Sequence, residues 1–186
     1  MKILVAITGA SGSPYALSLL KLFQKMGQET EIIVSHAAEK VLPLETGFAV
    51  PDLKKFTTRL YFEDEIAAPP ASGSARYRAM VVIPCTMGTL AAISQGFAKN
   101  LIVRAADVML KEKRPLILVV RETPLNRIHL KNMLAAQEAG AIIYPAMPAF
   151  YHRPKTLEEM VDFFAARIAE FLGFEITNLK RWRGIV

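Results

Sequence analysis

Residues 2–14, KILVAITGASGSP, decide the fold class of this chain. Residues 2–8 form an almost continuous apolar run of strand length, and the small residues that follow form a turn ending in Pro14. Residues 15–26 then place Leu17, Leu20 and Phe23 at helical spacing, which predicts a helix. A buried strand that leads through a short glycine-containing turn into a helix is the building unit of parallel α/β sheets.

The same alternation continues to the end of the chain. Further buried strands are predicted at residues 31–35, 80–84, 116–120 and 141–144, and further helices at 37–44, 88–98, 101–112, 125–139 and 157–172. Residues 47–74 are predicted to be irregular. Continuous apolar strands separated by helices indicate a parallel sheet that is covered on both faces. We therefore predict a doubly wound, Rossmann-like α/β fold in a single domain over residues 1–186.

The composition excludes several classes of protein. With 52% hydrophobic residues in 186, the chain can bury a sizeable core and is not a disordered tail. The single cysteine excludes an internal disulfide and favours a reducing compartment. Neither a signal peptide nor a membrane span is visible, so we expect a cytoplasmic protein with no membrane partner.

The formal net charge of +6 is consistent with two kinds of binding partner. Most of the basic excess lies in the second half of the chain, spread among apolar runs rather than gathered in a tail. Nucleic acid and a small phosphorylated ligand would each explain it, and charge alone does not decide between them. No nucleic-acid recognition motif is present, so we predict no nucleic-acid partner.

Two loops mark the predicted ligand site. An open parallel sheet binds its ligand beyond the carboxyl ends of the strands, where the winding direction reverses. Here the loops at that point are residues 8–14 (TGASGSP) and 85–89 (CTMGT), and each opens a helix whose free N–H groups suit an anion. One such loop alone would be an ordinary strand-to-helix turn. The pair favours a phosphorylated ligand.

Missing motifs narrow the choice of ligand. The first loop is not G-x-G-x-x-G, and the second strand ends in Ser35-His36 rather than in an acidic residue, which disfavours a dinucleotide. The P-loop pattern is absent, and residues 9–13 narrowly miss the G-x-S-x-G nucleophile elbow. The three histidines are scattered, so we predict no metal site. A mononucleotide such as FMN fits best.

Charged residues in the second half have both structural and functional interpretations. Arg104, Asp107 and Lys111 share one helical face, either as a solvated ion-pair ladder or as groups that need partners on a largely apolar helix. Arg121-Glu122 follows the strand at 116–120, on the ligand side of the sheet, where arginine is a phosphate donor and glutamate a proton carrier. The alternative is a self-paired surface turn. Cys85 is interpreted as a small buried thiol.

Nine short segments, in this order along the chain, closely resemble the UbiX-type flavin prenyltransferases. They are TGASG (8–12), ET (45–46), APPASGS (68–74), PC (84–85), RAAD (104–107), KE (111–112), RE (121–122), FYH (150–152) and RW (181–182). Each segment is a weak signal alone, whereas the ordered set spans the chain and is highly specific.

This resemblance implies an enzyme that binds reduced FMN and dimethylallyl monophosphate and joins the five-carbon unit to flavin N5 and C6 without a metal. The product, prenylated FMN, serves a separate UbiD-type decarboxylase. The family assembles as a homododecamer with sites at subunit junctions.

The resemblance also implies roles for individual residues. FMN would contact Gly9, Ala10, Ser11, Ser35, Thr86, Met87, Gly88, Thr89 and Arg121. The prenyl phosphate would contact Ser72, Lys111, Arg121, Tyr151 and Arg167. The catalytic set would be Ser11, Glu45, Glu122, Lys111 and Arg104, with Ser11, Glu45 and Glu122 managing protons. Some family members have a tryptophan where this chain has Ile66.

Two rival functions follow from the same fold. A flavin-dependent cysteine-type decarboxylase typically carries asparagines in P-A-S-A-N-T and P-x-M-N segments, and this chain has PASGS (70–74) and PAMP (145–148) instead. A non-catalytic FMN carrier or accessory subunit for a decarboxylase would bind FMN without changing it.

Overall fold

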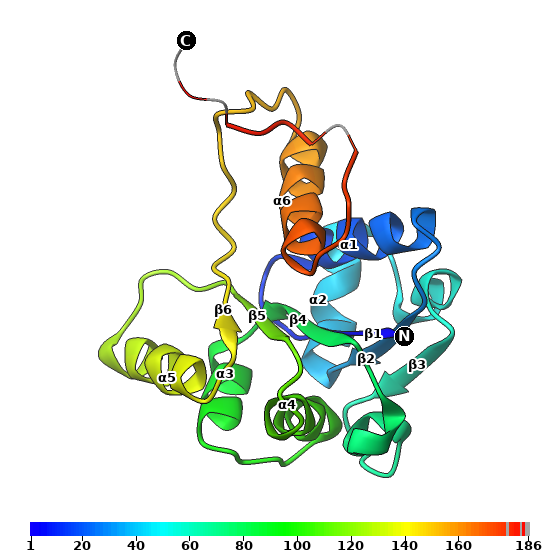
Figure 1. Cartoon of the computed structure of the whole chain (residues 1–186), viewed down its shortest axis with the longest axis vertical. Coiled ribbons are helices and arrows are strands. Elements are labelled where there is room, and N and C mark those ends of the chain that lie inside the picture. The colour runs from blue at the N-terminus through cyan, green and yellow to red at the C-terminus, as the bar shows by residue number, and fades with distance from the viewer. Residues whose placement is uncertain (178, 183, 185–186) are drawn as a thin grey trace.

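Six parallel strands form one sheet in the order β3-β2-β1-β4-β5-β6 (Figure 1). The computed structural model describes residues 1–177, 179–182 and 184. The strands are β1 (Ile3–Ile7), β2 (Thr30–Val34), β3 (Arg59–Phe62), β4 (Ala79–Cys85), β5 (Leu116–Val120) and β6 (Ile142–Ile143). The helices are α1 (Ser13–Lys25), α2 (His36–Thr46), α3 (Met87–Ser94), α4 (Leu101–Lys111), α5 (Arg127–Glu138) and α6 (Leu157–Phe171). The predicted doubly wound α/β fold is confirmed.

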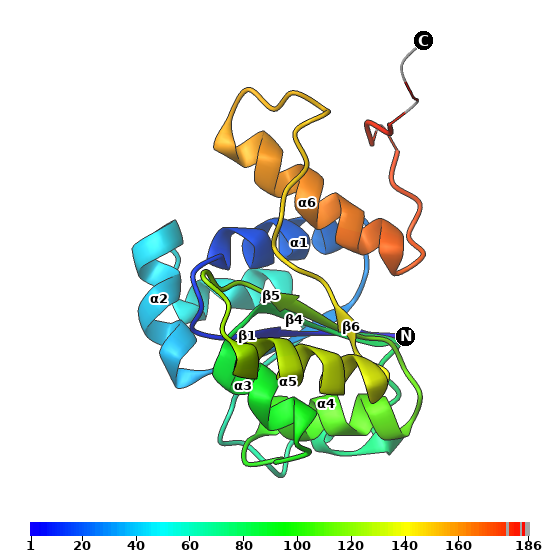
Figure 2. The same cartoon turned by 90° about the vertical axis from the view of Figure 1, so that its left-hand side faces the viewer.

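Helices cover both faces of the sheet (Figure 2). Alternate side chains of a strand point to opposite faces, so Ile3, Val5 and Ile7 pack under α1, α2 and α6. Leu4 and Ala6 pack with the layer of α3, α4 and α5 on the other face. Because both faces are buried, all five residues of β1 are apolar rather than alternating with polar ones.

The winding reverses between β1 and β4, as the sequence predicts. β1 pairs with β2 on one side and with β4 on the other. The carboxyl ends of β1 and β4 are joined by Thr8, whose Oγ1 donates to the Pro84 carbonyl at 2.7 Å and accepts from the Thr86 N–H at 2.9 Å. Thr8 is 1% exposed, so these bonds fix the two loops of the predicted ligand site to each other.

One strand is absent from the sequence-based prediction. Residues 47–74 were expected to be irregular, but they contain β3, the 3-10 turns η1 (Val50–Phe56) and η2 (Pro69–Ala71), and the start of a third, η3 (Gly73–Ala75). β3 lies at the edge of the sheet, and Tyr61 is the one residue of its four that is buried. Its apolar run, residues 60–62, is only three residues long and lies among polar neighbours, which is why its pattern does not stand out.

The described residues include no helix that is both long and apolar enough to span a lipid bilayer.

Candidate active site

Glu45 holds the loop that follows β1. Its Oε2 accepts hydrogen bonds from the N–H groups of Gly12, at 2.9 Å, and Ser13, at 2.8 Å. Gly12 adopts a φ of 127°, a conformation suited to glycine, and this turns both N–H groups toward α2. Partial burial raises the pKa of the Glu45 carboxyl, but hydrogen bonds from the Ser11 side chain and from the Gly12 and Ser13 backbone outweigh it, so the pKa lies below its ordinary value. A fixed carboxylate therefore lies at the N-terminus of α1.

Arg121 reaches the same loop from the other half of the sheet. It follows β5, and its Nε donates to the Ser11 carbonyl oxygen at 2.9 Å. β4 lies between β1 and β5, so the side chain crosses the carboxyl end of β4 to make this contact. Ser11, Glu45 and Arg121 thus meet around one loop.

A cavity of about 170 Å³ lies where β1, β2 and β4 end. The residues predicted to hold FMN that line it are Gly9, Ser35, Thr86, Gly88 and Thr89. Ser35 and Thr86 are the N-caps of α2 and α3, with Ser35 Oγ accepting from Ala38 N–H and Thr86 Oγ1 accepting from Thr89 N–H, both at 3.1 Å. The N-termini of both helices therefore lie at the cavity's edge, where free N–H groups would suit a phosphate, although the His36 N–H of α2 already donates to Glu63 Oε1.

Position 9 requires glycine because the backbone of the loop after β1 lies very close to Ala37. A Cβ added there would lie 2.4 Å from the Cβ of Ala37, at the start of α2. The loop after β1 is therefore held against α2 without room for a side chain, and the donor set around the cavity fits the phosphate end of a mononucleotide. Ala10 lies between Gly9 and Ser11, and Met87 packs against the core under α3 and α4.

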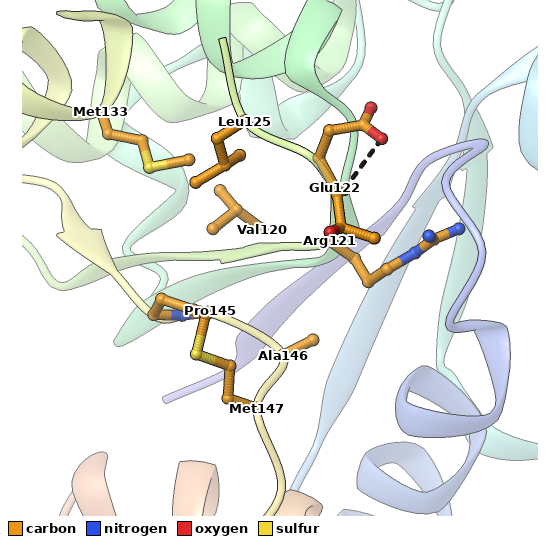
Figure 3. Close-up of a pocket in the computed structure, with 9 residues that line it drawn as sticks. Val120, Arg121, Glu122, Leu125, Met133, Pro145, Ala146 and Met147 are labelled. Carbon is orange, nitrogen blue, oxygen red and sulfur yellow. Dashed lines mark hydrogen bonds between the residues drawn. The ribbon is translucent and has the colours of Figure 1, made fainter. Parts of the chain in front are cut away.

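Glu122 lines a second cavity, of about 320 Å³, beside Arg121 (Figure 3). Val120, Leu125, Met133 and Met147 supply apolar side chains to its wall. Figure 3 shows Arg121 extending away from this apolar wall, while the Glu122 carboxylate accepts from the Thr123 N–H at 3.1 Å. A guanidinium and an exposed carboxylate at the rim of an apolar cavity suit a ligand that is partly charged and partly apolar.

Ser72, Arg104 and Lys111 lie along α4 and the turns η2 and η3 beside it. Arg104 Nε donates to the Ala71 carbonyl at 3.1 Å, and its Nη1 contacts Asp107 Oδ2 at 2.7 Å. Lys111 ends α4, just before the chain enters β5, and its Nζ contacts Glu112 at 2.7 Å. Arg104 follows Val103 of the switch-point cavity, whereas Lys111 lies near the amino ends of the strands, on the opposite side of the sheet from Ser11 and Arg121.

Tyr151 and Arg167 form a third group on the part of the molecule that extends away from the sheet. The segment between β6 and α6, which includes Tyr151, and helix α6 lie beyond one face of the sheet (Figure 1). Arg167 is an exposed residue of α6 and contacts Glu170. Ile66 is half exposed in the turn before η2. The described part of one chain does not bring the five predicted prenyl-phosphate residues together.

Among the further residues that line the cavity at the switch point, three polar ones were not singled out from the sequence: Glu63, Lys99 and Asn100. Glu63 Oε1 accepts from the His36 N–H at 2.8 Å, and its other oxygen accepts from the Asn100 side chain. Asn100 caps α4 through its Oδ1 and the Val103 N–H. The sequence contained a signal for Asn100, because an asparagine directly before an apolar helix is a typical N-cap. Nothing in the sequence linked Glu63 to that helix.

Cys85 is a buried thiol, as predicted. Burial raises its pKa to about 12, so it is not a thiolate nucleophile at neutral pH. The described residues contain no group of three or more His, Cys, Asp or Glu side chains that is arranged to hold a metal ion.

A family model described as Flavoprotein matches residues 1–170. Flavin prenyltransferase UbiX of Methanocaldococcus jannaschii is 44% identical over 182 residues, covering 98% of this chain and 98% of its own. The chain belongs to the UbiX-type flavin prenyltransferase family.

Two solved structures of UbiX-type proteins share this fold closely. A dodecameric FMN-dependent UbiX-like decarboxylase from Escherichia coli O157:H7 has a TM-score of 0.95 at 42% identity, covering 99% of this chain and 100% of that one. AnUbiX (PadA1), in complex with FMN and dimethylallyl pyrophosphate, has a TM-score of 0.96 at 40% identity, covering 100% of this chain and 98% of that one. The resemblance inferred from the ordered segments is confirmed.

Proposed function

We propose that this chain is a flavin prenyltransferase that joins the dimethylallyl group of dimethylallyl monophosphate to N5 and C6 of reduced FMN. The observation that carries this proposal is the meeting of Ser11, Glu45 and Arg121 around one loop at the switch point of the sheet. It is supported by the family to which the chain belongs. We treat residues 1–186 as one flavin-binding domain in the cytoplasm, which the single cysteine favours.

The residues around the switch point fit FMN. Gly9, Ser35, Thr86, Gly88 and Thr89 would hold its phosphate end in the smaller cavity. Ala10, Ser11, Met87 and Arg121 complete the proposed set. Reduced FMN, when bound, supplies the electron-rich ring that accepts the prenyl group.

The chain's own groups would act on the prenyl donor. Breaking the allylic C–O bond would leave an allylic cation, to be captured by the flavin, and a phosphate that becomes a dianion on taking up one proton; fixed cations would stabilise it without reorganising. Lys111, Arg121 and Arg167 would supply those cations, with Ser72 and Tyr151 as hydroxyl donors and Arg104 nearby. Glu122, at the rim of the larger cavity, would carry the proton to the leaving phosphate, while Ser11 and Glu45 would manage the proton at N5. The apolar wall formed by Leu125, Met133 and Met147 would exclude water.

Assembly would complete the site. The prenyl-phosphate residues lie in three separate places on one chain, and a homododecamer with sites at subunit junctions would bring them together. Exposed apolar side chains on α5 support an oligomer: Ile128, Leu130 and Leu134 are 67%, 54% and 58% exposed. The product would pass to a UbiD-type decarboxylase.

One experiment tests the activity. Purified protein is mixed anaerobically with reduced FMN and dimethylallyl monophosphate, and the molecular mass of the released flavin is measured by mass spectrometry. A five-carbon gain is the expected result. Unchanged FMN with decarboxylation of a peptidyl cysteine would indicate the cysteine-type decarboxylase, and unchanged FMN with no activity would indicate a carrier.

A further inference from the structure

The last part of the chain folds back over α6. Beyond α6, Phe174 packs against Phe23 with 5.4 Å between ring centroids, and the chain then runs alongside α6 toward the segment that precedes this helix (Figure 1). Residues 179–182, here called the C-terminal strap, end this return. Lys180 Nζ donates to the His152 carbonyl at 3.3 Å, which joins the strap to the residue next to Tyr151.

Trp182 of the strap contacts Tyr151. The two ring centroids are 5.8 Å apart with an interplanar angle of 74°, an edge-to-face arrangement. Phe163 of α6 makes a similar contact with Tyr151, at 5.7 Å and 88°. Tyr151 is 41% exposed, so without these neighbours its ring would have wide rotational freedom. Two aromatic edges from different parts of the chain restrict its orientation.

Arg181 of the strap acts on Arg167 through Glu170. Glu170 Oε1 accepts from Arg181 Nη2 at 2.5 Å and from Nε at 3.2 Å, while Oε2 contacts Arg167. Hydrogen bonding from Arg181 is the largest cause that lowers the pKa of Glu170, so this carboxylate is ionised at neutral pH. Two guanidinium groups thus share one carboxylate, and the cluster keeps a net positive charge. Without Arg181, Glu170 would neutralise Arg167.

We infer, on the basis of the proposed function, that the C-terminal strap positions the two α6-side ligands of the prenyl phosphate. In this inference Trp182 orients the Tyr151 hydroxyl, and Arg181 keeps Arg167 available to the dianion by sharing the charge of Glu170. Both are positioning residues, since each acts through another side chain. The free energy needed to orient Tyr151 and to free Arg167 is therefore not taken from substrate binding, because both side chains are already in place.

The test compares Arg181→Gln and Trp182→Ala in the FMN-loaded, full-length enzyme. Each variant is expected to raise the KM for dimethylallyl monophosphate about tenfold, with a smaller effect on kcat, because Arg181 and Trp182 touch no reacting group and Arg167 and Tyr151 would hold the phosphate before as well as during its departure. FMN affinity should not change. Trp182→Phe keeps an aromatic edge beside Tyr151, so its KM should stay close to that of the wild type. Lys155→Gln removes one exposed charge near α6 without contacting Glu170 and should leave KM unchanged.

Calorimetric titration of dimethylallyl monophosphate into the same FMN-loaded proteins gives a readout that is independent of turnover. Wild-type protein that binds and turns over, together with variants whose KM and Kd are unchanged, would overturn the inference and leave the proposed function standing. A fall in kcat that follows a fall in Tm would also overturn it, because that pattern indicates a structural role alone. Wild-type protein that neither binds nor turns over the donor would overturn the proposed function itself.

Discussion

Arg121 Nε donates to the carbonyl oxygen of Ser11 at 2.9 Å, although 110 positions separate the two residues along the chain. The contact passes over the end of β4 and joins the loop after β1 to the residue that ends β5. The hydrogen bond fixes the Nε–H of the guanidinium, so the Nη1 and Nη2 groups remain as donors for a ligand at the carboxyl ends of the strands. A cation at the proposed flavin site is thus oriented before any ligand arrives.

Arg121→Lys tests this orientation. Lysine keeps the charge but lacks the planar set of donors, so it cannot both bond Ser11 and present fixed N–H groups to a ligand. We expect the Kd for FMN to rise about tenfold, measured by quenching of flavin fluorescence. Arg127→Lys makes the same change at an exposed position at the start of α5 and should leave the Kd unaltered. Equal affinities in the two variants would contradict the role given to Arg121.

Glu45→Gln should lower the free energy of unfolding by about 1 kcal/mol at pH 7, because a charged acceptor is lost at the N-terminus of α1. The pKa of Glu45 is lower in the folded chain than its ordinary value of 4.5. The carboxylate therefore stabilises the fold at pH values above about 4.5, and this contribution is lost as the pH falls through the lowered pKa.

The pH dependence of Glu45→Gln separates this charge effect from a packing effect. Urea unfolding at pH 7 and at successively lower pH should show the difference between wild type and variant shrinking in acid. Glu138→Gln, at the exposed end of α5, should show little difference at either extreme. A constant difference across the range would show that the charge of Glu45 contributes nothing.

Thr8→Val removes the hydroxyl that joins the ends of β1 and β4. The Pro84 carbonyl loses its donor and the Thr86 N–H loses its acceptor, which costs about 2 kcal/mol of stability. Thr30→Val is a matched control, since Thr30 is equally buried and its Oγ1 donates to the Phe56 carbonyl away from the switch point. Both variants should lose stability in denaturant unfolding, but Thr8→Val alone should weaken FMN binding. If both variants lost FMN affinity, the weaker binding would be a consequence of general instability and not of the contact between β1 and β4.

Glu122→Gln should bind FMN normally and lose prenyl transfer by a factor of about 10² or more, because the amide cannot carry a proton to the departing phosphate. Flavin fluorescence measures binding, and the mass of the flavin with time measures transfer. Full activity in this variant would refute the proton-carrying role of Glu122.

Much of the fold is predictable from the sequence. The bounds predicted for the strand at 116–120 coincide with β5, and the helix at 157–172 matches α6 to within one residue. Both are bounded by clear signals, Pro115 before the strand and the Thr156 N-cap before the helix. β3 escapes prediction because a short edge strand, with one buried residue in four, leaves no periodic signal.

The candidate site is predictable in its location and less so in its contacts. The loops at 8–14 and 85–89 follow from the rule for parallel sheets, and a shared cavity between them is observed. The capping of α1 by Glu45 depends on how α2 packs beside α1, which no local pattern encodes. The same holds for Glu63, which reaches both the start of α2 and the cap of α4.

By itself, the sequence determined the layers of this protein and the end of the sheet at which the candidate site lies, because apolar periodicity dictates which faces are buried and strand–helix alternation dictates parallel pairing. Tertiary structure alone decided which side chains meet. Strand order brought Arg121 to Ser11, helix packing brought Glu45 to Gly12, and the path of the chain left Lys111 and Tyr151 apart from both. Such contacts depend on side-chain directions between elements far apart in the chain, and these directions exist only once the elements have packed.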